Sequence, residues 1–505
     1  MLQEDDTLVS KLIETLDSVV ITGKLESRNS YGIWKTPLNC TMKILDSNLC
    51  LNFASINNND SSSCNILLKD IISSKLVPIK STNYYYIKFV TYSHVNNINN
   101  RSRTRKSYLF TLQKVGNLNI EDVKNETKLI LYKLINNVIN FQAYIISRLN
   151  INNALLPFQS KKILIFVNPK SGSGTSIKTW NNIVKNILDE ALINYDLIIT
   201  EYANHAKQYI LSESYDNLIQ YANIVTIGGD GIVYEVINGL SNRVDNLVNI
   251  LPICPIPGGT GNGLIKSILY ENNENYTITN ATFLCIKGNS CNLDLSKVTT
   301  CNNKSYYSFL ILGWGLISDI DILSESMRYL GESRLYLAAL YFIAKKKKYK
   351  GKLYIHNKND RYDDDDYFVN MPSLDEHIVD NSEWICIDGN FILVWVLQTS
   401  HATASIHSGP DSFLNDGLFQ IFVVKDDVSR SDLIQLLIDF DTGKHVDHPK
   451  IKRYFTKAYR LVPDVDSSNN NNNNNNGIYT LDGEVIEYGP IQGTIEKGKA
   501  KTLKL

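Results

Sequence analysis

The chain has 505 residues, of which 43% are hydrophobic and 20% are charged, and its 51 basic and 52 acidic residues nearly cancel. These proportions are typical of a globular protein with two or three domains. The balanced charge argues against a dedicated nucleic-acid-binding protein, because such proteins carry an excess of Lys and Arg. The eight scattered cysteines, the lack of a signal-peptide pattern and the lack of a bilayer-length apolar run favour a cytoplasmic protein with peripheral association to membranes.

The first 150 residues contain short β-rich runs, followed by a helical pattern with one apolar face between residues 129 and 145. Several strands closed by one helix predict a β-rich, pleckstrin-homology-like module over residues 1–150. The expected strands lie at 19–25, 41–45, 49–53, 84–92 and 108–113. A basic turn at 101–106 has two open interpretations: a solvated loop, which we favour, or a contact with anionic lipid headgroups.

Residues 160–276 show a different pattern, in which apolar runs alternate with helical segments. The apolar runs lie at 163–167, 197–200, 224–227 and 251–256. Alternating strands and helices predict an α/β domain with a parallel sheet.

Residues 277–505 change again to many short strands separated by turn residues, with one helix expected at 335–350. This pattern predicts an antiparallel β-sandwich domain. Insertions are expected near 356–382 and 466–476, where an acidic run and eight consecutive asparagines are typical of surface loops.

Two glycine-rich turns follow neighbouring strands of the predicted parallel sheet. Gly228-Gly229-Asp230-Gly231 follows one strand, and the segment from Pro257 to Asn262 follows the next. Because glycine has no Cβ, its backbone amide can approach phosphate oxygens closely. An aspartate in such a turn serves a metal ion, a hydroxyl group or the turn itself. Together the two turns predict a nucleotide-dependent phosphotransferase.

Three motifs resemble the nucleotide-site motifs of the diacylglycerol-kinase-like lipid kinase superfamily: Asn168 to Gly174, Gly228 to Gly231, and Pro257 to Asn262. Two later segments, Gly313 to Asp321 and Ser324 to Arg334, are similar to those of the sphingosine (long-chain-base) kinases. The resemblance implies an α/β nucleotide-binding domain, a β-sandwich lipid-binding domain and a cleft between them. It also implies ATP with Mg²⁺ as the phosphoryl donor.

The resemblance implies that Asp230 orients the lipid hydroxyl and accepts its proton during phosphoryl transfer. The alternative is an aspartate that caps the following helix. Nucleotide-site or supporting positions of the family match Asn168, Thr200, Gly229, Gly231, Glu235, Gly258, Gly259, Thr260, Gly261, Arg328, Arg334, Asp482, Gly483 and Glu484. For Asp482 and Glu484 a plain Asp-Gly hairpin is an equally supported interpretation. The metal ligands stay unassigned.

Basic residues are the expected partners of the phosphates. Arg328 and Arg334 match family arginines that reach the nucleotide, and a guanidinium group suits phosphate geometry. Either arginine could instead form a surface ion pair with Glu325 or Glu332. The run 345–348, which is all lysine, is interpreted as a solvated helix end, with contact to anionic lipid as the alternative.

Asp321 is expected to decide the substrate class. A long-chain base carries an ammonium group beside its primary hydroxyl, and a partly buried carboxylate can pair with it. Ceramide has an amide there and gains nothing from a negative partner. Asp319 is the alternative partner. The lipid tail requires an apolar tunnel, for which the candidates are Leu316, Ile317, Ile320, Leu436, Leu437 and Phe440. His445 matches a family position at the lipid pocket, although a lone histidine is more often structural.

The favoured interpretation is a kinase that transfers the γ-phosphate of ATP to the primary hydroxyl of sphingosine or a related long-chain base, giving sphingosine 1-phosphate. A ceramide or diacylglycerol kinase is the nearest alternative, and Asp321 argues against it. NAD kinases share the Gly-Gly-Asp-Gly turn, but the long antiparallel region fits a lipid alcohol better. A catalytically inactive lipid-binding scaffold is the alternative from another class. The sequence leaves the oligomeric state open.

Overall fold

The computed structural model divides the chain into two compact units, Met1–Lys161 with Asn186–Asn194, and Lys162–Lys185 with Tyr195–Leu505. The structure describes residues 21–27, 38–45, 48–54, 61–67, 70–78, 85–94, 102–111, 162–172, 174–259, 261–327, 330, 333–357, 369–379, 381, 383–464 and 477–505.

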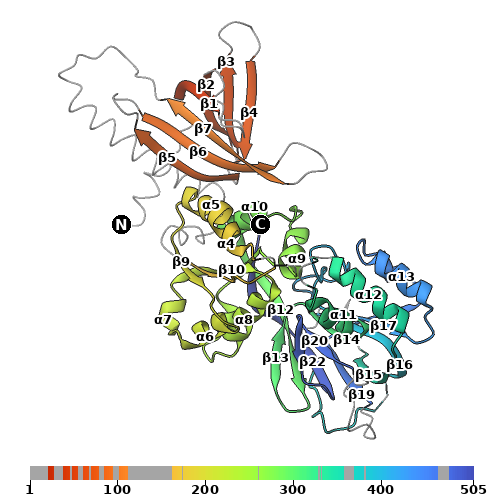
Figure 1. The fold of residues 1–505 in the computed structure, drawn as a ribbon. Coiled ribbons are helices and arrows are strands. Elements are labelled where there is room, and N and C mark those ends of the chain that lie inside the picture. The colour runs from red at the N-terminus through yellow and green to blue at the C-terminus, as the bar shows by residue number, and fades with distance from the viewer. Residues whose placement is uncertain are drawn as a thin grey trace, which may run out of the picture. The chain divides into compact units, whose positions relative to one another are not determined.

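The N-terminal unit contains an antiparallel sheet of seven strands in the order β4-β3-β2-β1-β7-β6-β5 (Figure 1). Its strands are β1 (Ile21–Ser27), β2 (Leu38–Leu45), β3 (Asn48–Ala54), β4 (Ser61–Leu67), β5 (Ile71–Pro78), β6 (Tyr85–His94) and β7 (Arg103–Thr111). The sequence predicted five of these strands and missed β4 and β5. The expected helix between residues 129 and 145 lies outside the described residues.

The basic segment 101–106 is not the turn that was predicted, because β7 already begins at Arg103. The Arg103 guanidinium is buried, forms an ion pair with Asp70 at 2.8 Å and donates to the backbone oxygen of Tyr92. Alternation along a strand turns every second side chain inward. One of the basic residues therefore stabilises the sheet.

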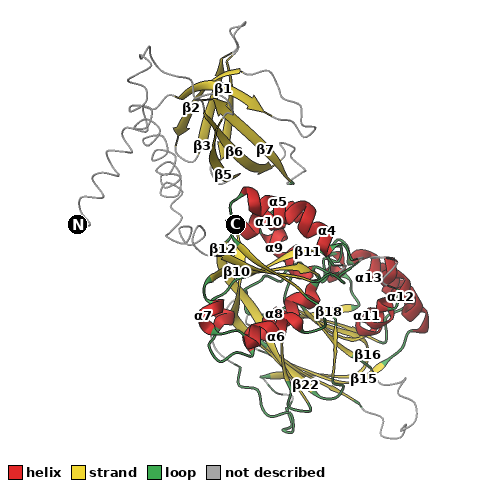
Figure 2. Ribbon diagram, turned by 60° about the vertical axis from the view of Figure 1, so that its left-hand side comes forward, coloured by secondary structure: helices red, strands yellow, loops and turns green. Residues whose placement is uncertain are grey.

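A parallel sheet in the order β9-β8-β10-β11 forms the first part of the larger unit. Its strands are β8 (Lys162–Val167), β9 (Tyr195–Ile199), β10 (Tyr221–Gly228) and β11 (Ile253–Pro257). The helices are α4 (Ser176–Thr179), η2 (Trp180–Val184), α6 (His205–Ser212), α7 (Tyr215–Leu218), α8 (Asp230–Ser241), η3 (Leu247–Asn249), α9 (Gly263–Glu271) and α10 (Ile278–Lys287). Helix α5 (Lys185–Glu190) belongs, except for its first residue, to the N-terminal unit. Helices α6 and α8 lie on one face of the sheet and α9 and α10 on the other (Figure 2). Because helices cover both faces of the sheet, its strands consist of continuous apolar runs.

The strand order creates a switch point between β8 and β10. The chain leaves β8 toward β9 on one side and leaves β10 toward β11 on the other. In open α/β sheets, ligands bind outside the carboxyl ends of the strands at such a point. The turns that follow β8 and β10 are therefore placed to contact a ligand.

Antiparallel strands continue the same sheet. They are β12 (Asn289–Thr300), β13 (Ser305–Ser308), β14 (Ile311–Gly315), β15 (Tyr349–His356), β16 (Trp384–Leu397), β17 (Phe419–Lys425), β18 (Ile451–Thr456), β19 (Ala458–Pro463), β20 (Tyr479–Leu481), β21 (Glu484–Ile486) and β22 (Ile491–Lys504). The helices of this part are α11 (Leu316–Glu325), α12 (Ser333–Lys345), α13 (Arg430–Asp439) and η5 (Lys444–Asp447). Apolar side chains from β12, β14–β17, β19, β20 and β22 meet in one core. The two-layer sandwich stays a prediction, since these strands form one branched sheet.

The C-terminal strand β22 connects the two parts of the larger unit. It pairs along most of its length with β12, and Thr502 pairs with Ile253 of β11 in parallel. The Thr502 hydroxyl also donates to the backbone oxygen of Ile253 at 2.8 Å. The boundary expected between residues 276 and 277 therefore does not separate two independent sheets.

Two predicted elements of this part differ from the structure. The helix expected over 335–350 ends at Lys345, because Lys346 has a left-handed backbone and β15 begins at Tyr349. The strands expected at 384–387 and 391–398 are one long strand, β16. Among the described residues, no helix is both long and apolar enough to cross a bilayer.

Candidate active site

A cavity of about 590 Å³ extends from the carboxyl ends of the parallel strands to the helices of the antiparallel part. The turns after β8, β9, β10 and β11 form its polar end. Helices α11, α12 and α13 with strand β16 contribute mainly apolar side chains. This volume is in the range typical of small-molecule sites. One continuous space thus joins a polar chamber to an apolar one.

The two glycine turns need glycine because their backbones pack against each other. A Cβ on Gly259 would lie 2.5 Å from the Cα of Gly229, and a Cβ on Gly229 would lie 2.9 Å from the backbone oxygen of Gly261. The Gly258 N–H also donates to the backbone oxygen of Gly228 at 2.8 Å. The glycines therefore hold the turns together as well as opening them to a ligand.

Of the predicted glycine positions, Gly229, Gly231, Gly259, Gly261 and Gly483 line the cavity. Gly258 does not line it, because it lies against Ser176, whose Oγ would be 2.6 Å from a Cβ there. Thr260 and Arg328 lie outside the described residues.

Asp230 begins α8 at the polar end of the cavity, where it is 8% exposed. Its carboxylate accepts the backbone N–H groups of Gly263 at 2.8 Å and Leu264 at 3.3 Å, which begin α9. The helix-cap alternative thus holds for α9 and not for α8. Burial raises the pKa of the Asp230 carboxyl to about 6, although the two backbone N–H groups act in the opposite direction. A carboxylate with a pKa near neutrality suits a general base.

Asn168 and Thr200 follow β8 and β9 and line the cavity beside Lys170. The Asn168 side chain accepts the N–H of Lys170 at 2.9 Å, which shapes the turn. Lys170 was not predicted as a site residue, and neither were Glu201 and Tyr202 in the next turn. Their position directly after two strands of a parallel sheet was the signal that could have found all three.

Glu235 lies on α8, one turn beyond Asp230, and also lines the cavity. Its carboxylate accepts the backbone N–H groups of Asn204 at 2.9 Å and Ala206 at 3.1 Å, at the start of α6. Burial raises the pKa of the Glu235 carboxyl, and these N–H groups lower it. Glu235 therefore positions the turn after β9.

Arg334 lines the cavity, but its guanidinium group already forms an ion pair with a carboxylate. It is 8% exposed, pairs with Glu325 at 2.9 Å and donates to the backbone oxygen of Ser324 at 3.1 Å. The ion pair with Glu325 that the alternative interpretation proposed is therefore present, with the arginine buried and the Glu325 side chain 41% exposed. A guanidinium group has five N–H donors, so this pairing still permits contact with a ligand in the cavity.

Asp482 and Gly483 both have left-handed backbones and form the turn of the β20–β21 hairpin. The buried Asp482 carboxylate accepts the Ser308 hydroxyl at 2.8 Å and the backbone N–H of Ile311 at 2.9 Å. It also accepts the N–H groups of Phe309 and Leu310. Burial raises the pKa of Asp482 to about 7 against these four bonds. Asp482 lines the cavity, but its oxygens already hold the β13–β14 turn in place.

The residues at this end of the cavity that could hold a metal ion are carboxylates. Among the described residues, no three His, Cys, Asp or Glu side chains converge as a metal site. Kinases often hold Mg²⁺ through one or two carboxylates and the substrate phosphates. Glu484 suits this role, because it is exposed, lines the cavity and lies 3.9 Å from where a Cβ on Gly231 would be.

Asp321 on α11 lines the cavity, whereas Asp319 does not. Asp321 accepts the Thr480 hydroxyl at 3.2 Å, and burial raises the pKa of its carboxyl to about 7. Asp319 accepts the Tyr349 hydroxyl and lies 3.8 Å from the Lys347 ammonium. The two carboxylates therefore have different surroundings, and the favoured one faces the ligand space.

The predicted tunnel residues line the apolar end of the cavity. They are Leu316, Ile317, Ile320, Leu436, Leu437 and Phe440. His445 is not part of that wall: it is fully buried, contacts the Ser408 backbone oxygen through Nε2 at 2.8 Å and packs against Phe422 and Phe440. Its expected contact with the lipid is therefore corrected to a packing position behind Phe440.

The sequence also matches a family of known proteins. Residues 162–298 match the family described as the diacylglycerol kinase catalytic domain. The glycine turns, the buried aspartate and the apolar chamber in one cavity define the same class, an ATP-dependent lipid kinase.

Relatives that match a longer part of the chain identify the family within this class. Sphingosine kinase 1 from Arabidopsis thaliana is 31% identical over 356 residues, which cover 65% of this chain and 69% of the relative. Sphingosine kinase 1 from Mus musculus and from Homo sapiens are each 29% identical, with 66% of this chain and 88% of each relative covered. The chain belongs to the sphingosine kinase family. A crystal structure of a diacylglycerol kinase from Bacillus anthracis aligns with 19% identity and a TM-score of 0.45, over 68% of this chain and 97% of that chain.

Proposed function

We propose that this protein transfers the γ-phosphate of ATP to the primary hydroxyl of a sphingoid base, with Mg²⁺ as the accompanying ion. The observation that carries the proposal is the presence of Asp230 and Asp321 on the wall of one cavity, together with the glycine turns and the apolar chamber. Family membership supports the same reaction.

Asp321 favours a sphingoid base over a neutral lipid as the substrate. It is the aspartate of α11 that reaches the cavity, and apolar residues of the same helix, Leu316, Ile317 and Ile320, line it as well. A protonated amine beside this carboxylate would form a charge-assisted hydrogen bond and stabilise its ionised form. A ceramide amide or a diacylglycerol ester would face the same carboxylate without a charge to pair with it. This contrast favours sphingoid bases over the two alternatives.

Asp230 supplies the proton acceptor. The start of α9 holds both of its oxygens through two N–H groups, so the carboxylate has a defined direction. Its raised pKa lets it take the hydroxyl proton as the oxygen attacks the γ-phosphorus. Its burial keeps bulk water from this position. A base held in this way acts mainly in the transition state.

The phosphate chain is held by the turns around Asp230. Gly229, Gly259 and Gly261 allow a close approach to the backbone, and the Lys170 ammonium lies on the same wall. Glu484 would hold Mg²⁺, which would neutralise part of the phosphate charge. Arg334 adds a cation on the side of α12.

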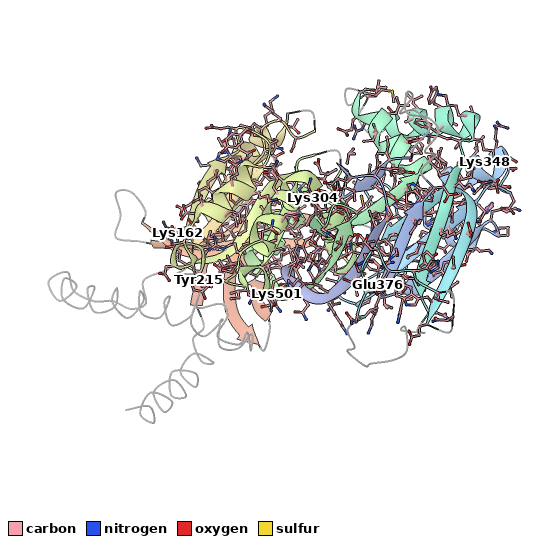
Figure 3. The ribbon with its side chains drawn as sticks, turned by 90° about the horizontal axis from the view of Figure 1, so that it is seen from below. Lys162, Tyr215, Lys304, Lys348, Glu376 and Lys501 are labelled. Atoms are coloured by element: carbon pink, nitrogen blue, oxygen red, sulfur yellow. The ribbon has the colours of Figure 1, made fainter. Side chains whose placement is uncertain are left out.

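Peripheral contact with membranes is part of the proposal, since the substrate must leave a bilayer. Helices α12 and α13 both line the apolar chamber, yet they expose apolar side chains outside it. These are Leu337, Leu340, Tyr341, Ile434 and Ile438, with exposed fractions between 41% and 59%. Lys348, just beyond α12, lies at the opposite end of the larger unit from Lys162 and Tyr215 (Figure 3). Such an apolar surface suits contact with a bilayer, whereas Lys348 itself is paired with Asp426 at 2.9 Å.

Two further expectations remain proposals. The strand order of the N-terminal sheet supports a pleckstrin-homology-like module, whose ligand is open. The cytoplasmic location rests on the scattered cysteines of the sequence.

The test is a labelled-ATP assay of the full chain with sphingosine, dihydrosphingosine, phytosphingosine, ceramide and diacylglycerol, each in mixed micelles. We expect turnover with the three free bases and little with the two neutral lipids. Equal use of ceramide and sphingosine would contradict the role of Asp321. The absence of turnover with all five lipids would favour the inactive scaffold.

A further inference from the structure

A short loop between β16 and β17 forms part of the cavity wall. Ala402, Thr403 and Ile406 line the cavity. The Ala402 N–H donates to the backbone oxygen of Ile406 at 3.1 Å, which closes the loop on itself. We call residues 402–406 the wall loop. His401 and His407 flank it directly in the sequence.

The imidazole rings of His401 and His407, the histidine pair, stack on each other at the base of the wall loop. Their centroids are 4.4 Å apart, and 11° separates their planes. Tyr270 of α9 contacts both rings, with centroid distances of 5.0 Å to His401 and 5.1 Å to His407. Aromatic pairs attract each other beyond the area that they bury. The histidine pair therefore holds the two ends of the wall loop together.

His401 connects the wall loop to the proposed base. Its backbone N–H donates to Ser267 Oγ at 3.0 Å, and the Ser267 hydroxyl donates to the backbone oxygen of Gly263 at 2.9 Å. Gly263 is the residue whose N–H donates to the Asp230 carboxylate. A displacement of His401 would therefore reach Asp230 through two intervening residues of α9.

His407 connects the wall loop to the apolar end of the cavity. Its backbone N–H donates to the backbone oxygen of Phe440 at 3.0 Å, and Phe440 lines that end. The Gly409 N–H donates to the backbone oxygen of Ser400 at 3.0 Å, which adds a second closure beyond the histidine pair. The pair thus lies between the polar and the apolar ends of one cavity.

The surroundings keep both imidazoles neutral. His401 is buried, and its Nδ1 lies 2.9 Å from the Ser400 hydroxyl. Nε2 of His407 is buried without a hydrogen-bond partner among the described residues. Burial lowers the pKa of His401 to about 3, and His407 and Lys266 act in the same direction. Burial and then Lys266 lower the pKa of His407, whereas Asp411 raises it.

The charged and titratable groups around the pair give a proton little compensation. Lys266 and Tyr270 face it from α9, and His445 faces it from η5. Asp411 is the acidic neighbour, but it already pairs with Arg453 of β18. A protonated imidazole would be buried beside an ammonium group, so protonation favours an open wall loop in which the rings reach water.

We propose that the histidine pair positions Asp230 and Phe440: the neutral, stacked rings hold the wall loop closed, and their protonation opens it. The link to catalysis rests on the proposed function. Because the pKa of each histidine is lowered in the closed form, the open form binds protons first. The closed form is therefore fully favoured above about pH 6.5 and loses its advantage as the pH falls below that value.

The experiment measures amide hydrogen exchange of the full chain in peptides that cover residues 399–409. The N–H groups of Ala402, His407 and Gly409 report on opening, because all three are hydrogen-bonded in the closed form. Exchange rates corrected for the intrinsic effect of pH give an opening constant. His407→Phe keeps a ring that cannot be protonated, and His407→Leu removes the ring. His377→Phe is the matched control, since His377 is exposed and does not line the cavity.

Two protons bind on opening of the parent chain, so its opening constant should rise about 100-fold between pH 7.5 and pH 5.5. In His407→Phe the rise should be about tenfold, since one imidazole is left. His401→Phe should give the same tenfold rise from the other ring. At pH 7.5 the opening constant of His407→Leu should be about 2- to 12-fold higher, the range for one aromatic pair, and that of His407→Phe should match the parent chain. His377→Phe should behave as the parent chain at both pH values.

Two results would overturn the inference. One is the same rise with acid in the parent chain and in both Phe variants, because the histidines would then not be the groups that take up the protons. The other is equal opening of His407→Leu and His407→Phe at pH 7.5, because stacking would then not hold the loop.

Turnover of sphingosine at pH 7.5 tests the link to Asp230. kcat should fall, by up to about 100-fold, in His407→Leu and recover in His407→Phe, because a small displacement of a positioned base lowers the rate steeply. The Kd of ADP should change in neither variant. An unchanged kcat in His407→Leu would overturn the positioning role. If the parent chain phosphorylates no lipid while the exchange results hold, the proposed function fails and the acid-sensitive loop stands.

Discussion

The Asp230 carboxylate and the backbone N–H of Gly263 are joined by a 2.8 Å hydrogen bond, so the first residue of α9 holds the proposed base in place. Gly263 has no room for a side chain, since a Cβ there would lie 2.6 Å from the backbone oxygens of His401 and Ala402. The turn after β16 therefore backs the helix that orients Asp230. The two parts of the larger unit meet at this point.

Asp230→Asn should lower kcat by about 10²–10⁴-fold, because an amide cannot accept the hydroxyl proton and a positioned general base contributes about this much. The variant keeps nearly the same side-chain size, so ADP binding should stay close to that of the parent chain. Single-turnover kinetics and calorimetry measure the two quantities. A folded variant with near-normal turnover would exclude Asp230 as the base.

Asp321→Asn should raise the KM for sphingosine far more than the KM for ATP. Truncating one partner of a buried charge pair costs about 2–5 kcal/mol, which corresponds to tens- to thousands-fold. Asp319→Asn is the matched control, since Asp319 lies on the same helix but outside the cavity wall. A selective KM effect in Asp319→Asn alone would show that the wrong carboxylate was chosen.

The KM for sphingosine should also depend on pH. Burial raises the pKa of Asp321 to about 7, so the carboxylate is ionised above that pH and protonated below it. Lowering the pH from 8 to 6 should therefore raise this KM by about tenfold, since only the ionised form pairs with the ammonium. In Asp321→Asn this dependence should disappear. A KM independent of pH in the parent chain would contradict the pairing.

Asp482→Ala should destabilise the protein rather than affect nucleotide affinity alone. It would leave the Ser308 hydroxyl and three backbone N–H groups without their buried acceptor. One unsatisfied buried group costs about 1–3 kcal/mol, so we expect a loss of about 3 kcal/mol or more in the free energy of unfolding. Urea denaturation measures it. Asp427→Ala, which removes only an exposed pair with Lys450, should change stability by less than about 1 kcal/mol. Equal effects in the two variants would refute the structural role of Asp482.

The sequence alone determined the elements whose causes are local. Continuous apolar runs located the four parallel strands, and the glycine turns directly after two of them located the polar end of the cavity. Asp321 could be preferred over Asp319 through a family resemblance and the chemistry of an amine. The strand predictions succeed because strand burial and turn conformation depend on neighbouring residues. The choice of Asp321 stays a prediction.

Only the tertiary structure decided roles that depend on distant partners. Asp482 and the β13–β14 turn are more than 170 positions apart, and no periodicity connects them. Contacts with distant partners also decide three other features. They are the pairing of β22 with β11, the packing position of His445 and the end of α12 at Lys345. Tyr202 could be placed on the cavity wall only once the strand order put its turn beside that of β8. Long-range pairing is a property of the whole fold, because it depends on which surfaces remain to be buried once local elements have formed.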